Sequence, residues 1–169
     1  MPVMEKSDLT PRQYWEQVKA NPNRARFGFG QKAALINIDL QRAYTDIDSF
    51  RTAYQTDPGQ IEYINQLSKL ARDRNMPVIW TYVAYMENAD DAGTWGTRTN
   101  TPDSLQNIKE GDERAELDPR LDIDTERDAI VNKRMASVFH DTLIPSLLVW
   151  HQVDTVILTG GSTSGCIRA

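Results

Sequence analysis

The stretch that decides the fold is TVILTGGSTSGCIRA, residues 155–169. Its first four residues are apolar and mostly β-branched, which is typical of a buried strand. A turn of glycine and small hydroxyl residues follows, and it carries Cys166, the single cysteine of the chain. We interpret this turn as a strand-to-helix elbow that presents Cys166 at a helix N-terminus. Backbone N–H groups and the helix dipole there lower the pKa of a thiol and can hold an oxyanion.

Three apolar segments upstream predict further strands. They are Ala33–Ile38 (AALINI), which ends at Asp39; Val78–Tyr85 (VIWTYVAY); and Ala129–Val131, which is followed by Lys133. Each is short and rich in aliphatic, β-branched or aromatic residues, as strands buried in a parallel sheet are.

Two apolar stripes with helical spacing lie between these strands. One begins after Asp57-Pro58-Gly59, contains Ile61, Ile64, Leu67, Leu70 and Ala71, and closes at Asn75. The other contains Leu143, Ile144, Leu147 and Leu148, with Pro145 tolerable in a first turn. A strand, helix, strand order predicts right-handed parallel βαβ units. The fold class is therefore α/β, an open and mainly parallel sheet flanked by helices.

The length of 169 residues predicts one domain. Residues 1–32 are polar and proline-containing, and we interpret them as an N-terminal arm with a short amphipathic helix around Tyr14 and Trp15 that packs on the domain or on a neighbouring subunit. Residues 33–169 form the α/β domain. Within it, residues 86–128 are polar and interrupted by glycine and proline, which predicts a long excursion over the surface.

Composition excludes several classes of function. The net charge is -5 and the nineteen basic residues are scattered, so nucleic acid is not an expected partner. No apolar run approaches the roughly 18–20 residues that span a bilayer, and no membrane partner is expected. A single cysteine and the polar N-terminus fit a reducing compartment, which predicts a cytoplasmic location.

Three chemically apt side chains follow predicted strands: Asp39, Lys133 and Cys166. Sites in open α/β sheets form outside the carboxyl ends of the strands, so we expect these three to meet. Taken singly, the aspartate could cap a turn, the lysine could be solvated, and the cysteine could be inert packing. Their joint placement favours a catalytic site.

At these positions the chain resembles the isochorismatase-like cysteine hydrolases, and within them the N-carbamoylsarcosine amidase and maleamate amidohydrolase group. The resemblance rests on Ile38-Asp39-Leu40-Gln41, on Lys133 within NKRMASVF (132–139), and on TGGSTSGCIRA (159–169). It implies that Asp39, Lys133 and Cys166 form a catalytic triad. It also implies a cis peptide at Gly161–Ser162 and an oxyanion site built by Gly161, Ser162 and Gly165 of the elbow.

The resemblance further implies a mechanism without metal or cofactor. Cys166 attacks the carbonyl of a small amide or ureido substrate, Asp39 moves the proton, Lys133 offsets the negative charge, and ammonia leaves from a thioester intermediate. Family members commonly form dimers or tetramers, so a homo-oligomer is expected. They also continue past the cysteine motif into residues that hold the substrate's carboxylate, so we expect the working protein to be longer than this chain.

Weaker site candidates are Trp95, Phe139 and Gln41, each of which could bind substrate. Trp95 and Phe139 could equally be packing residues, and Gln41 and Arg42 could be surface residues or support the end of the first strand. His140 and His151 have no metal-binding spacing and are taken as non-catalytic. The related nicotinamidases carry an Asp-x-His motif for a metal, and Asp46-Ile47-Asp48 lacks its histidine.

Two other classes of function stay open. One is a non-catalytic α/β scaffold, against which the intact Asp39, Lys133 and Cys166 argue. The other is an isochorismatase-type hydrolase of other small molecules, such as vinyl ethers. Such enzymes typically carry glycine at the nucleophile position, so the cysteine counts against that class. A redox thiol is a further alternative, but the chain has no C-x-x-C motif.

Overall fold

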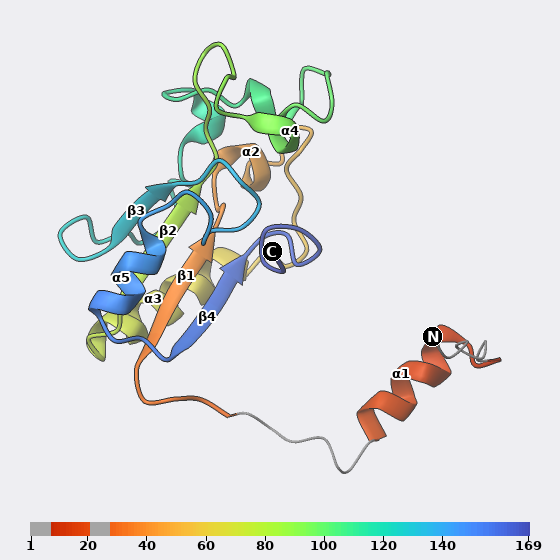
Figure 1. Cartoon of the computed structure of the whole chain (residues 1–169), viewed down its shortest axis with the longest axis vertical. Helices are drawn as coiled ribbons and strands as arrows, with labels where there is room; N and C mark the ends of the chain where they lie inside the picture. Colours follow the sequence, from red (N-terminus) through yellow and green to blue (C-terminus); the bar gives the residue numbers. More distant parts are fainter. Residues whose placement is uncertain (1–7, 21–27) are drawn as a thin grey trace, which may run out of the picture.

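The computed structural model describes residues 8–20 and 28–169, and its centre is a four-stranded sheet (Figure 1). The strands are β1 Ala33–Ile38, β2 Val78–Tyr82, β3 Ala129–Asn132 and β4 Thr155–Gly160. Every pairing is parallel and the strand order is β3-β2-β1-β4. The predicted α/β class with a parallel sheet is therefore confirmed.

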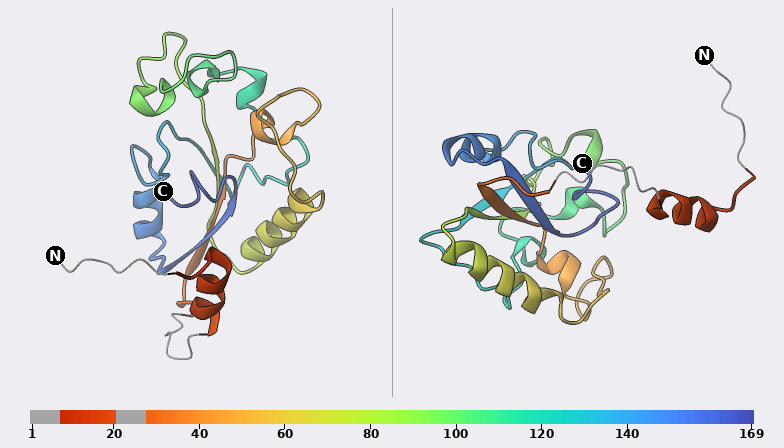
Figure 2. Two further views of the ribbon diagram at one scale, coloured as in Figure 1. Left: turned by 90° about the vertical axis from the view of Figure 1, so that its right-hand side faces the viewer. Right: turned by 90° about the horizontal axis from the view of Figure 1, so that it is seen from below.

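Helices cover both faces of the sheet. Figure 2 shows α3, Gln60–Asp73, on one side and α5, Ile144–Trp150, on the other. Alternate residues of β1 serve the two layers, because Leu35 packs in the cluster that includes residues of α3 and Ile36 in the cluster that includes residues of α5. Both core clusters therefore meet at the central strand.

The apolar run of β1 follows from its central position. It pairs with β2 over residues 35–37 and with β4 over residues 33–38, so both of its edges are used. Ala34, Leu35, Ile36 and Ile38 are completely buried. A parallel strand covered on both faces needs apolar side chains on both, which is why AALINI shows no alternation.

β2 ends at Tyr82, three residues before the predicted end at Tyr85. The backbone at Val83 and Ala84 bonds to side-chain amides instead of a neighbouring strand. Gln41 accepts from the N–H of Val83 and donates to its carbonyl oxygen. Asn132 does the same for Ala84. The residues of this segment have strand propensity, which is why the strand was predicted to reach Tyr85. Their backbone groups bond to side chains instead of a neighbouring strand, so β2 ends earlier.

The excursion, residues 86–128, contains only short helices, as its broken pattern predicted: α4 Gly93–Gly96, η1 Leu105–Asn107 and η2 Glu113–Ala115. Figure 1 shows the part with these helices at the end of the sheet toward which the strands point, next to α2, Arg42–Thr45. Residues 122–128 instead run back beside α3 to the start of β3. Ile108 and Ala115 of the excursion pack with Ala43 of α2 in a buried cluster. The part with these helices is thereby fixed over the carboxyl ends of the strands.

The N-terminal arm contains the predicted helix, α1, Pro11–Ala20. None of its residues is buried, and Tyr14 and Trp15 remain more than half exposed. Packing of the arm on a neighbouring subunit stays a prediction. The other parts of the arm, residues 1–7 and 21–27, lie outside the described residues. Within the described residues, no helix has the length and apolarity to cross a membrane.

Candidate active site

The structure brings Asp39, Lys133 and Cys166 together at the carboxyl ends of β1, β3 and β4. The Nζ atom of Lys133 lies 2.8 Å from Oδ2 of Asp39 and 3.3 Å from Sγ of Cys166. The same ammonium group donates to the carbonyl oxygen of Met135 at 3.2 Å. One cation thus joins the carboxylate to the thiol.

Lys133 is completely buried, so the interpretation as a solvated lysine is wrong. Its side chain and that of Asp39 are 0% and 1% exposed. A buried cation is tolerated only when charges and hydrogen-bond acceptors compensate it, and the three contacts of Nζ do so. The lysine reaches this position because its backbone N–H donates to Tyr82 at the end of β2.

Thr81 of β2 fixes the position of Asp39. The N–H of Asp39 donates to both oxygens of Thr81, the carbonyl at 3.1 Å and Oγ1 at 3.2 Å. The Thr81 hydroxyl donates to Oδ1 of Asp39 at 2.9 Å. Asp39 has a φ of 53°, in the left-handed region that aspartate adopts more readily than most residues. The chain therefore turns immediately after β1 while the carboxylate stays anchored to the neighbouring strand.

The elbow after β4 requires glycine at position 160. Gly160 has a φ of 95°, and a Cβ atom there would lie 2.0 Å from the carbonyl oxygen of Ile38. The same carbonyl accepts the N–H of Gly161 at 3.1 Å, which ties the elbow to the end of β1. The peptide bond between Gly161 and Ser162 is cis.

The predicted helix N-terminus at Cys166 stays a prediction, and the bond from the N–H of Ala169 to the carbonyl of Gly165 at 3.1 Å has the spacing of a first helical turn. Residues 163–168 form turns, closed by bonds such as that from the N–H of Gly165 to the carbonyl of Ser162 at 3.0 Å. Burial raises the pKa of the Cys166 thiol, the charge of Asp39 raises it further, and Lys133 opposes the increase. Among the described residues these influences together raise the thiol pKa, so the resting site favours the protonated thiol.

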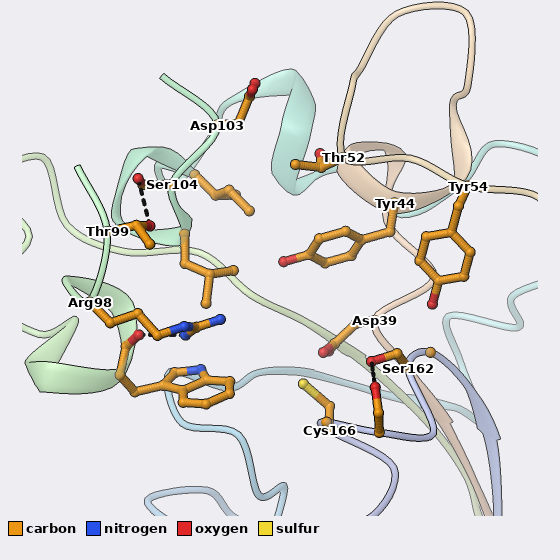
Figure 3. Close-up of a pocket in the computed structure, with 16 residues that line it drawn as sticks. Asp39, Tyr44, Thr52, Tyr54, Arg98, Thr99, Asp103, Ser104, Ser162 and Cys166 are labelled. Atoms are coloured by element: carbon orange, nitrogen blue, oxygen red, sulfur yellow. Dashed lines mark hydrogen bonds between the residues drawn. The ribbon is translucent and has the colours of Figure 1, made fainter. Parts of the chain in front are cut away.

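A cavity of about 450 Å³ opens above Cys166 and Asp39 (Figure 3). Ser162, Ser164 and the glycines of the elbow line it beside the thiol. Its other sides come from the segment after β1 and from the excursion, with Tyr44, Tyr54, Trp95, Arg98, Leu105 and Ile108 among them. The thiol therefore faces a space of small-molecule size with mixed apolar and polar walls.

Two tyrosines that the sequence did not single out face this cavity. Figure 3 shows Tyr44 and Tyr54 directed toward the space above Asp39 and Ser162. Burial is the main cause that raises the pKa of Tyr44, and the negative charges of Asp39 and Cys166 add to it. The Tyr44 hydroxyl is consequently neutral near pH 7. No motif marks either tyrosine, because each reaches the site only through the turn after β1.

The weaker candidates separate into two groups. Trp95 of α4 lines the cavity, as its prediction as a substrate-binding residue requires. Gln41 does not line the cavity, because its buried amide bonds to Val83 and to the carbonyl of Arg114. Phe139 is 46% exposed and lies outside the residues that line the cavity. Gln41 therefore supports the ends of the strands and the excursion instead of contacting substrate.

Metal ligands are not gathered at the site. Across residues 8–20 and 28–169, no group of three or more His, Cys, Asp or Glu is placed to hold a metal ion. Asp46 accepts a hydrogen bond from Arg42 at 2.8 Å, so this member of the Asp46-Ile47-Asp48 stretch serves an ion pair. His140 and His151 do not line the cavity.

Two curated proteins that this chain resembles are amidohydrolases. It is 34% identical over 148 residues to maleamate amidohydrolase of Pseudomonas putida KT2440, covering 85% of this chain and 66% of that protein. It is 26% identical to N-carbamoylsarcosine amidase of an Arthrobacter species, covering 86% of this chain and 54% of that protein. The chain thus spans between about half and two thirds of the length of these curated relatives.

The fold also matches solved structures. A cysteine hydrolase from Pseudomonas syringae pv. phaseolicola superposes with a TM-score of 0.73 at 24% identity, covering 81% of this chain and 62% of that one. The family model described as the isochorismatase domain matches residues 33–169. This chain belongs to the isochorismatase domain family.

Proposed function

We propose that the site is that of a metal-independent cysteine amidohydrolase, acting on a small linear amide or ureido substrate similar to N-carbamoylsarcosine and releasing ammonia. The observation that carries the proposal is the position of the Lys133 ammonium between the carboxylate of Asp39 and the thiol of Cys166. Asp39 and Cys166, the proposed base and nucleophile, line one cavity, and the buried ammonium of Lys133 contacts both.

The first half of the reaction begins with proton transfer from Cys166 to Asp39. Because the thiol pKa is raised, the nucleophile rests protonated and becomes a thiolate only when Asp39 takes its proton. The sulfur then bonds to the substrate carbonyl carbon. Throughout this transfer the negative charge passes from carboxylate to sulfur, and both atoms stay in contact with Lys133. The lysine therefore stabilises the ion on either side of the transfer.

The tetrahedral intermediate needs hydrogen-bond donors for its oxyanion. The backbone N–H of Cys166 has no acceptor among the described residues, and the same holds for Ser162. Both belong to the elbow that Gly160 and Gly161 tie to β1. We assign the oxyanion to N–H groups of this elbow, whose backbone bonds hold it in place beside β1.

Collapse of the intermediate releases ammonia. Asp39 returns its proton to the leaving nitrogen, the carbon–nitrogen bond breaks, and the acyl group remains on Cys166 as a thioester. Water then gives a proton to Asp39 as its oxygen bonds to the carbonyl carbon. The carbon–sulfur bond breaks, and the thiolate recovers the proton from Asp39, so the site returns to its starting state.

The experiment that tests this proposal is ammonia release from N-carbamoylsarcosine, other N-carbamoyl amino acids, maleamate and nicotinamide. Cys166→Ala should lower the rate on the best substrate by more than about a thousandfold, because no other thiol is present in this chain. The midpoint of thermal unfolding should change little and serves as the control for folding. Retention of turnover in Cys166→Ala would eliminate the thioester mechanism.

The same assay separates the alternatives. A hydrolase of vinyl ethers would release no ammonia from any of these compounds. A non-catalytic scaffold would likewise be inactive toward all of them, and no compound of the panel would change the rate at which Cys166 is alkylated. The cytoplasmic location and the dimer or tetramer stay predictions based on sequence.

A further inference from the structure

Arg134 comes directly after Lys133, at the carboxyl end of β3, and its side chain contacts the excursion. Its Nε atom lies 2.5 Å from Oδ2 of Asp91, and its Nη2 atom lies 3.2 Å from Oε1 of Glu110. We propose that Arg134 is a positioning residue that holds α4, and with it the Trp95 wall of the cavity, in register with the reacting groups. The proposal rests on the amidohydrolase function and adds a residue that sets the position of the bound substrate. We call Arg134, Asp91 and Glu110 the clamp.

Asp91 connects Arg134 to the start of α4, which it precedes by two residues. Its second oxygen, Oδ1, accepts the N–H of Met86 at 3.0 Å, which closes the loop before α4. Burial raises the pKa of Asp91, but the hydrogen bonds from Arg134 and from the N–H of Met86 outweigh it and lower the pKa below its ordinary value. The side chain of Asp91 is 10% exposed and that of Arg134 29%, so water screens this ion pair less than a surface pair.

Apolar packing gives α4 little attachment of its own. The helix is one turn long, Gly93–Gly96, and Gly96 is its one buried residue. Gly96 lies against the ring of Tyr85, because a Cβ atom there would be 3.1 Å from Cζ of the tyrosine. Ala92, just before the helix, is buried in the same cluster as Tyr85. A glycine and an alanine bury little apolar area, so the ion pair of Arg134 supplies a large part of what holds α4 in place.

The segment that carries Arg134 also contacts the cation of the site. The carbonyl oxygen of Arg134 accepts the hydroxyl of Tyr85 at 2.8 Å. The carbonyl oxygen of the next residue, Met135, accepts Nζ of Lys133 at 3.2 Å. The end of the Met135 side chain lies beside α4, 3.4 Å from where a Cβ atom of Gly93 would stand. Three consecutive residues therefore connect Lys133 to α4, and they set the distance between the cavity wall and the reacting groups.

Glu110 extends the clamp to the part of the excursion that follows α4. Its Oε1 atom also accepts from Nδ2 of Asn132 at 3.3 Å, and its backbone N–H donates to the carbonyl of Tyr85 at 3.0 Å. The Glu110 side chain is 54% exposed, so its contact with Arg134 is more strongly screened than that of Asp91. We therefore expect Asp91 to be the more important partner.

The first test measures hydrogen exchange of the backbone amides in α4 and needs no substrate. The N–H groups of Gly96 and Thr97 donate to the carbonyls of Ala92 and Gly93, so they exchange when α4 opens. Arg134→Gln should speed their exchange by about threefold to tenfold, because the ion pair opposes this opening. The amides of β1 should keep their exchange rate, which serves as the control for global stability.

Matched variants show whether the clamp acts as a unit. Asp91→Asn should speed exchange in α4 as much as Arg134→Gln does, and the double variant should add nothing further. Glu110→Gln should have a smaller effect, and Arg134→Lys should retain most of the protection. Arg120→Gln removes an arginine that pairs with Asp118 at 2.6 Å elsewhere on the excursion, and it should leave the exchange of α4 unchanged.

Turnover shows whether the clamp positions substrate. Arg134→Gln should raise KM for the best amide substrate by about threefold to tenfold and change kcat by less than about twofold, because the loosened wall weakens binding in the ground state and the transition state alike. The rate at which iodoacetamide alkylates Cys166 at one pH should stay within about twofold, since the thiol keeps its own contacts. A change confined to KM separates positioning from a general loss of structure.

Each outcome bears on the clamp separately from the proposed function. Unchanged exchange of α4 in Arg134→Gln overturns the clamp even if ammonia is released, and so does equal acceleration in Arg120→Gln or an additive effect in the double variant. Faster exchange with an unchanged KM overturns the positioning role and leaves the amidohydrolase function standing. Faster exchange with no ammonia from any amide supports the clamp and overturns that function. If Arg134→Gln does not fold, Asp91→Asn decides by the same criteria.

Discussion

The floor of the cavity and its far side are built in different ways. On the floor, Asp39 and Lys133 are buried at strand ends and are held by strand-to-strand contacts. On the far side, Trp95 and Arg98 belong to the excursion, which has only short helices and leaves Arg98 exposed. If the proposed function holds, the parallel sheet fixes the reacting groups, and an irregular segment forms the opposite wall of the cavity.

The largest effect is expected from removing the buried cation, Lys133. Lys133→Met keeps a similar volume but leaves the buried Asp39 carboxylate without its ion pair, which should cost about 3–5 kcal/mol of unfolding free energy. Denaturant titration measures that loss. The variant should also lose most ammonia release, because charge on sulfur is no longer stabilised.

The pH dependence of alkylation gives the same variant a second, independent test. Lys133 opposes the rise in the pKa of Cys166, so its removal should move the midpoint of the alkylation–pH profile further upward. In the unmodified protein that midpoint should already lie above the value of about 8.5 for a free thiol, since burial and Asp39 raise the pKa. A midpoint that does not move in Lys133→Met would remove the proposed electrostatic role of the lysine.

A smaller effect is expected from Thr81, which contacts Asp39 but not the cavity. Thr81→Val retains the shape and removes the hydroxyl that orients Oδ1, so kcat should fall by about tenfold with little change in KM. Thr81→Ser restores the hydroxyl and should recover most of the rate. Failure of serine to rescue the rate would show that Thr81 acts only through packing.

The smallest expected effects are changes in KM on substitution of two aromatic residues, Trp95 and Phe139. Trp95 supports Arg98 beside the cavity, whereas Phe139 lies outside it and is 46% exposed. Trp95→Leu should raise KM for the best amide substrate by about threefold to tenfold, since an aromatic wall of the cavity is lost. Phe139→Leu should change KM by less than about twofold. Equal effects on KM would contradict the role of Trp95 as a wall of the cavity.

Much of the fold could be predicted because its signals are local. The run AALINI followed by Asp39 predicted β1 with its correct bounds, and the stripe after Gly59 predicted α3. The end of β2 was predicted wrongly because the amides of Gln41 and Asn132, distant in sequence, bond to the backbone at Val83 and Ala84. A local pattern cannot reveal partners of that kind.

The sequence by itself determined the parallel α/β architecture and the strand ends at which Asp39, Lys133 and Cys166 lie, since apolar runs and the glycines of the elbow are local properties. Only the tertiary structure decided that Thr81 anchors Asp39, that the thiol pKa is raised, and that Arg98 faces the cavity. These depend on burial and on distances between segments that lie tens of residues apart.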